Sequence, residues 1–108
     1  MALAVVLVVP SASALAQQAP AVNMQAASFD LTEVHIQPGQ SVVWNNASSA
    51  EHTVTADDGS FDSGDVETGD QYTMQFNAVG VYPYFCQYHG GPGAAGMSGV
   101  IVVDAPTD

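Results

Sequence analysis

The sequence predicts an all-β protein, a Greek-key β-sandwich of seven to eight strands. Two observations predict this fold. Strand-favouring segments alternate along the chain with turn residues of the Gly, Asn, Asp and Pro types. No helical apolar periodicity persists beyond the first sixteen residues, so no crossover helix is expected. The 108 residues are enough for one domain with one compact core.

The N-terminal residues predict export. An apolar run at Ala2–Val9 is too short to span a bilayer, and the small residues up to Ala16 form a cleavage site. Residues 1–16 are therefore expected to be a signal peptide, although no Lys or Arg precedes the apolar run. A short buried strand is the alternative. Without a Cys at the cleavage point or a transmembrane segment, we expect a soluble periplasmic or extracellular protein.

The elements of the mature chain follow in order. Residues 17–21 are expected to form a flexible N-terminus, 22–104 the domain, and 105–108 a polar tail. The expected strands are 22–26, 29–36, 41–44, 52–55, 71–76, 79–85 and 98–103. In the second of them Phe29, Leu31, Val34 and Ile36 are expected to point inward. Asn46-Ala47-Ser48 fits a glycosylation sequon, a tripeptide that is common by chance.

Charge and cysteine content exclude some classes of function. Eleven acidic residues face no Lys and no Arg, for a formal charge of −11. Nucleic acid is excluded as a partner because nothing could neutralise its phosphates. The single Cys rules out an internal disulfide. In an exported protein an odd Cys requires another explanation, either as a metal ligand or as a reactive thiol.

Three residues near the C-terminus form a candidate metal site. Cys86-x-x-His89 places a thiolate and an imidazole close enough to bind one ion, and Met97 adds a soft thioether. Two His, one Cys and a weak axial Met make the blue-copper arrangement. His52 is the candidate for the missing His, whereas His35 is expected on the outward face of its strand.

Each of these residues has an alternative interpretation. Cys86 alone would be a small core hydrophobe, His89 an exposed loop residue and His52 a core residue. A zinc site is less consistent with the pattern, because structural zinc favours four Cys or His ligands without Met. Hydrolytic zinc needs a base, and Glu51 is the only one nearby. The acidic segment 57–70 fits no calcium-loop template, so a solvated loop is expected there.

Further motifs surround these residues. They are Gly39 to Asn46 (GQSVVWNN), His52-Thr53-Val54, Phe61-Asp62-Ser63-Gly64, and Gly80 to Cys86 (GVYPYFC), with His89, Met97 and Gly99. Across Val22–Val103 the sequence resembles the plastocyanin/azurin family of small blue copper proteins (cupredoxins), nearest to plastocyanin, pseudoazurin and halocyanin-type domains.

The resemblance implies a function for the four candidates. It makes His52, Cys86, His89 and Met97 the ligands of one type 1 copper ion, and His89 the port through which electrons enter and leave. Two departures stand out. Seven residues separate His89 from Met97, more than in plastocyanin or pseudoazurin. Thr53 stands where plastocyanins carry an Asn that braces the ligand loops, and its hydroxyl is expected to provide a hydrogen bond instead.

We therefore expect a one-electron carrier that cycles between Cu(I) and Cu(II), not an enzyme. The alternative is a copper-binding or copper-delivery protein without redox cycling. A copper oxidase or nitrite reductase needs further His ligands, and only His35 is spare. Six of the eleven acids lie in 57–70, where they would steer a basic c-type cytochrome to His89; solubility alone is the other explanation. A monomer is expected.

Overall fold

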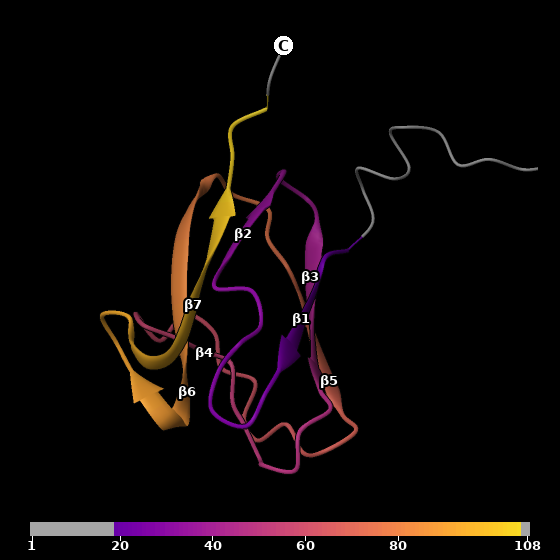
Figure 1. The fold of residues 1–108 in the computed structure, drawn as a ribbon. Coiled ribbons are helices and arrows are strands. Elements are labelled where there is room, and N and C mark those ends of the chain that lie inside the picture. Colours follow the sequence, from indigo (N-terminus) through magenta and orange to yellow (C-terminus); the bar gives the residue numbers. More distant parts are fainter. Residues whose placement is uncertain (1–18, 107–108) are drawn as a thin grey trace, which may run out of the picture.

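The computed structural model of the protein describes residues 19–106, which form a two-layer β-sandwich (Figure 1). The strands are β1 (Ala21–Met24), β2 (Glu33–Ile36), β3 (Ser41–Asn46), β4 (Thr55–Ala56), β5 (Gln71–Gln75), β6 (Gly80–Gly91) and β7 (Ala95–Val103). The predicted all-β sandwich is confirmed. The expected signal peptide, residues 1–16, lies outside the described residues.

The two sheets are interleaved in sequence. One sheet has the order β1-β3-β5 and the other the order β2-β7-β6-β4. β1 runs parallel to β3 and β2 parallel to β7, whereas β6 and β7 form a long antiparallel pair. Because the chain passes repeatedly between the two sheets, each layer depends on the other for its core.

The core contains the inward-facing side chains of both sheets. In β1, β2 and β3 every second residue is buried, the period expected of strands with one face on a core. Trp44 and Tyr84 are both buried at its centre, with ring centroids 5.3 Å apart and planes at 83°. Phe29 makes a second edge-to-face contact with Tyr84 at 4.9 Å. Such pairs add to the stabilisation from buried area.

The expected strand at 29–36 is shorter in the structure. Its pairing with β7 begins only at Glu33, opposite Val100. Phe29 lies in an isolated bridge with Met24 and is buried, whereas Leu31 is 45% exposed. The expectation that Leu31 points inward was therefore wrong. The chain bends before β2, so the alternation of the sequence does not continue across 29–36.

The expected strand at 52–55 is also shorter in the structure and begins later. β4 contains only Thr55–Ala56, and His52 precedes it as a single bridge residue opposite Val66. Two backbone hydrogen bonds form this bridge: His52 N–H donates to the Val66 carbonyl at 3.1 Å, and Val66 N–H donates to the His52 carbonyl at 2.7 Å. His52 is thus held by the acidic segment rather than by a strand of its own.

The segment between His89 and Met97 is a hairpin and not an irregular loop. Gly90 pairs with Gly96 and Gly91 with Ala95, so that β6 and β7 continue almost to the turn. A side chain at Gly90 would place its Cβ 2.6 Å from the carbonyl oxygens of Ala95 and Met97. Glycine is required there because the two backbones approach so closely.

Candidate metal centre

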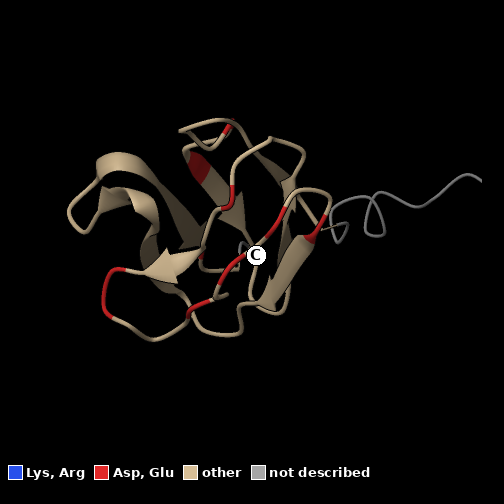
Figure 2. Cartoon of the chain, turned by 90° about the horizontal axis from the view of Figure 1, so that it is seen from below, with Lys and Arg blue, Asp and Glu red and all other residues tan. Residues whose placement is uncertain are grey.

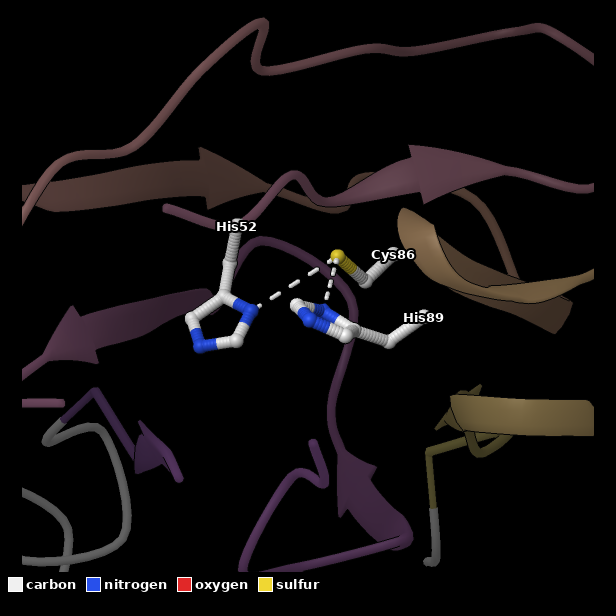
Figure 3. A group of neighbouring side chains, drawn as sticks. All are labelled: His52, Cys86 and His89. Carbon is white, nitrogen blue, oxygen red and sulfur yellow. Dashed lines mark hydrogen bonds between the residues drawn. The ribbon is translucent and has the colours of Figure 1, made fainter. Parts of the chain in front are cut away.

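Three side chains converge at one end of the sandwich. Cys86 Sγ lies 3.7 Å from His52 Nδ1 and 3.6 Å from His89 Nδ1 (Figure 3). One ligand atom from each of the three lies within 4.8 Å of the others. The sequence interpretation of these residues as neighbours is confirmed, although they come from segments more than thirty positions apart.

Cys86 and His89 reach the site through an irregularity in β6. The register of β6 against β7 shifts between Phe85 and Gly90, and both residues lie within this shift. A bulge of this kind bends the strand and re-aims its side chains, and such bulges are common beside functional sites. Cys86 is fully buried, whereas His89 is exposed. The cluster therefore has one edge at the protein surface.

The His52 ring is fully buried, and its pKa is lowered. Burial is the largest cause, because it disfavours the charged imidazolium. The neighbouring His89 ring, whose centroid is 5.1 Å away, lowers the pKa further. A backbone hydrogen bond with Gln25 acts in the opposite direction. The neutral imidazole favoured here is the form that binds a metal.

The spacing of the donors fits one metal ion. In a trigonal arrangement around a first-row ion, nitrogen at about 2.1 Å and sulfur at about 2.3 Å are separated by roughly 3.8 Å. The observed separations of 3.7 and 3.6 Å are close to this value. Two imidazoles and one thiolate in a trigonal set, with a weak axial thioether, are typical of a blue-copper centre.

Thr53 connects the two segments that carry the donors. Its backbone N–H points to Cys86 Sγ at 3.4 Å, and its hydroxyl accepts the N–H of Gln87 at 2.9 Å. The same hydroxyl lies 2.9 Å from the Thr55 hydroxyl, which donates to Asp62 at 3.1 Å. The expectation that Thr53 provides a hydroxyl hydrogen bond is confirmed.

Met97 lies on β7, the strand that pairs with β6, which carries Cys86 and His89. It is 1% exposed and two positions after Ala95, whose partner on β6 is Gly91. The alternative methionines, Met24 on β1 and Met74 on β5, belong to the other sheet. Met97 is therefore the methionine that lies on the same strand pair as Cys86 and His89.

His35 is separate from this cluster, as expected. Its exposed ring hydrogen-bonds Asp104 through Nδ1 at 2.9 Å and Glu33 through Nε2 at 3.3 Å. These contacts raise its pKa, the hydrogen bond with Asp104 being the largest cause. Because the two carboxylates lie at opposite ring nitrogens, they do not form a common ligand set with the ring.

One contact of the site was not anticipated from the sequence. The Ser48 hydroxyl lies 2.9 Å from His52 Nε2, the ring nitrogen that faces away from Cys86. In the sequence Ser48 was noted only as the third residue of Asn46-Ala47-Ser48, a glycosylation sequon that is common by chance. The Asn46 side chain is only 1% exposed and hydrogen-bonded, so it is not accessible for glycosylation in the folded chain.

The fold and the three donors define a small metal-binding β-sandwich, and comparison with known proteins identifies the family. The family model described as a cupredoxin-like domain matches residues 1–103. Plastocyanin of Scenedesmus fuscus is 33% identical over 86 residues, covering 69% of this chain and 85% of its own. Amicyanin-alpha of Methylorubrum extorquens is 33% identical over 97 residues, covering 82% and 77% respectively. The chain belongs to the cupredoxin family.

Solved structures share the fold. A purple cupredoxin from Nitrosopumilus maritimus superposes with a TM-score of 0.68 at 24% identity, covering 79% of this chain and 99% of its own. A reduced Cu(I) form of an amicyanin variant gives a TM-score of 0.69 at 24% identity, covering 80% and 82%. Family membership and the His-Cys-His donor set assign one copper ion, in a type 1 site, as the cofactor. Within residues 19–106 no helix is long and apolar enough to cross a bilayer.

Proposed function

We propose that the protein is a soluble one-electron carrier whose copper is held by His52, Cys86 and His89, with Met97 as the axial ligand. The observation that carries this proposal is the convergence of both histidine Nδ1 atoms on Cys86 Sγ at 3.6–3.7 Å. When bound, copper supplies a one-electron couple between Cu(I) and Cu(II).

Different residues of the chain would have different roles in such a carrier. Cys86 and His52 are fully buried, so water is kept from the thiolate and from one imidazole. Thr53 and its hydrogen bonds hold the two segments in place, which limits rearrangement when the charge changes. His89 is exposed and connects the buried donors with the surface. Electrons would enter and leave at this edge.

A copper-delivery protein is the alternative. Delivery requires that the ion be handed over, and a site with two fully buried donors disfavours this. The two functions are separated by electrochemistry. A carrier gives a reversible potential and exchanges electrons faster than it loses copper, whereas a delivery protein transfers copper to an acceptor chelator on the time scale of mixing.

The test of the site is the visible spectrum of the copper-loaded protein. The wild type should show intense thiolate-to-copper absorption, and Cys86→Ser should abolish it. Far-ultraviolet circular dichroism should show that the Ser variant retains its β-structure. If the Ser variant remains blue, or if the wild type binds Cu(II) without colour, the assignment of these ligands fails.

The acidic loop, defined here as residues 57–70, is proposed to guide a basic redox partner such as a c-type cytochrome. Support comes from its contacts with β6 and with the turn between β6 and β7. The Tyr88 hydroxyl donates to Asp65, which raises the pKa of Tyr88 to about 12, and Gly93 N–H donates to Asp57 at 2.9 Å. Acidic residues are spread over the surface without any Lys or Arg between them (Figure 2).

Two double variants with the same change in net charge test this docking proposal. Asp65→Asn with Glu67→Gln removes charge from the acidic loop, whereas Asp30→Asn with Glu33→Gln removes it elsewhere. Electron transfer with a basic cytochrome should slow more for the first pair at low salt. The difference should fade near 0.15 M salt, where the screening length is about 8 Å. Equal slowing by both pairs would leave net charge as the only contribution.

Export is proposed from the N-terminal sequence, with cleavage after Ala16. Residues 17–21 and 105–108 would then flank the domain of residues 22–104. N-terminal sequencing of protein recovered from the periplasm or culture medium tests this directly. A mature chain that still begins at Met1 contradicts it. The mass from native size-exclusion chromatography tests the expectation of a monomer.

A further inference from the structure

A buried polar cluster surrounds the ring nitrogen of His52 that faces away from Cys86. The Ser48 hydroxyl lies 2.9 Å from His52 Nε2. It also lies 2.7 Å from Asn46 Oδ1 and 3.1 Å from the Ala50 carbonyl. Because His52 and Asn46 are almost wholly excluded from solvent and Ser48 is partly buried, water has little access to these contacts.

The orientation of the Asn46 side chain is determined by its neighbours. Its amide nitrogen donates to the carbonyls of Ala50 and Val66, each at 2.8 Å. Carbonyls can only accept, so the nitrogen must face them and Oδ1 must face Ser48. The Ser48 backbone N–H also donates to Oδ1, at 3.0 Å. An acceptor is thereby presented to the Ser48 hydroxyl.

Counting protons around Ser48 then determines the role of His52 Nε2. The hydroxyl has one proton, and both Asn46 Oδ1 and the Ala50 carbonyl can only accept it. Its lone pairs remain for the Ala50 N–H at 3.2 Å and for His52 Nε2. The contacts of the hydroxyl with Asn46 Oδ1 at 2.7 Å and with His52 Nε2 at 2.9 Å are both hydrogen bonds only if Nε2 carries a proton and donates it to Ser48. The opposite tautomer would take the Ser48 proton away from Asn46.

The Nε2–H tautomer also suits the position of the other ring nitrogen. A protonated Nε2 leaves the lone pair on Nδ1, which faces Cys86 Sγ. The backbone bonds between His52 and Val66, the residue whose carbonyl also anchors Asn46, connect the cluster to the ligand itself.

We propose that Ser48 is a positioning residue that, backed by Asn46, holds His52 in the Nε2–H tautomer and so presents Nδ1 to the metal. The role for copper depends on the function proposed above, whereas the tautomer is a property of the metal-free chain. Partners of this kind orient a ligand ring, and their loss typically costs about 10–100-fold in metal affinity.

The first experiment needs no metal. Long-range ¹H–¹⁵N correlation spectra of the metal-free protein near pH 8 report which nitrogen of His52 carries the proton. The wild type should show the Nε2–H form alone, and Ser48→Ala should show a larger fraction of the Nδ1–H form. A wild-type ring in the Nδ1–H form would overturn the proposal, whatever the protein does with copper.

The second experiment measures Co²⁺ affinity by competition with a chelator, followed by the thiolate-to-cobalt absorption. Ser48→Ala should bind about 10–100-fold more weakly, whereas Ser48→Thr, which keeps the hydroxyl, should recover most of the loss. Ser49→Ala, an exposed neighbour, is the matched control and should bind as the wild type does. Wild-type affinity and tautomer in Ser48→Ala would refute the proposal. If that variant fails to fold, the wild-type tautomer and the Ser48→Thr affinity decide.

Discussion

The hydroxyl of Thr53 accepts the backbone N–H of Gln87 at 2.9 Å. Thr53 follows His52 in the chain and Gln87 follows Cys86, so this bond joins the segments that carry the two buried donors. Thr53 N–H, which points to Cys86 Sγ at 3.4 Å, provides a second connection between the same segments. Thr53 therefore contributes directly to the relative position of the two donors.

Replacing this hydroxyl should destabilise the protein even without metal. Thr53→Val keeps the shape of the side chain but leaves the Gln87 N–H without its acceptor. We expect the free energy of unfolding to fall by about 1–3 kcal/mol, as measured by urea denaturation of the metal-free protein. Thr73→Val, on the exposed face of β5, is the control and should change stability by less than about 0.5 kcal/mol. Equal effects at both sites would mean that Thr53 has no special role.

Gly99 is required by the close packing of Tyr84. A Cβ at residue 99 would lie 2.5 Å from the Tyr84 hydroxyl oxygen, and that ring is buried in the core. Gly99→Ala should lower the free energy of unfolding by about 1–3 kcal/mol, the usual cost of overpacking. Gly91→Ala, which meets nothing within 4 Å, should be nearly neutral.

A second substitution tests the cause of that loss. Tyr84→Phe removes the hydroxyl, which has no hydrogen-bond partner within the described structure, and should recover part of the stability of Gly99→Ala. If Tyr84→Phe instead makes Gly99→Ala still less stable, a clash with the Tyr84 hydroxyl oxygen is not the cause of the lost stability.

The pH dependence of stability should contain a contribution from His35. Asp104 and then Glu33 raise its pKa above the ordinary histidine value of 6.5 by hydrogen bonding the charged ring. A pKa raised by folding stabilises the native state fully below pH 6.5, and this stabilisation is lost as the pH rises through the folded pKa. Wild type and His35→Gln should therefore differ more in unfolding midpoint at pH 5.5 than at pH 8.5.

The His35 resonance gives an independent check on this contribution. In an NMR titration its midpoint should lie above 6.5 and should move down in Asp104→Asn. A midpoint unaffected by that substitution would assign the shift to another group.

Met97 should tune the potential of the copper site more than its affinity. A weak axial thioether slightly favours Cu(II), so its removal in Met97→Leu should keep the blue colour and raise the reduction potential. Cyclic voltammetry of both proteins measures the change. Met74→Leu on the other sheet is the control and should leave the potential unchanged. A response to Met74 but not to Met97 would reassign the axial ligand.

Local pattern was sufficient for several features of this protein. Alternating side chains predicted strands at β3 and β5, because one face of each strand meets the core. Cys86 and His89 could be paired from spacing alone, because only two residues lie between them and a single bend of the chain brings both side chains to one ion. The absence of Lys and Arg excluded nucleic acid without any coordinates. These features depend on residues close together in sequence or on composition.

Other features were decided only by tertiary contacts. His52 reaches the site because Val66 holds its backbone, and Ser48 meets Nε2 because Asn46 is anchored on carbonyls up to twenty positions away. Leu31 is exposed because the pairing of β2 with β7 begins two residues later. The glycine-rich segment is a hairpin because β6 and β7 continue to pair beyond His89. Strand register and long-range hydrogen bonds depend on which distant segments pair with each other. The local periodicity of side chains does not specify that pairing.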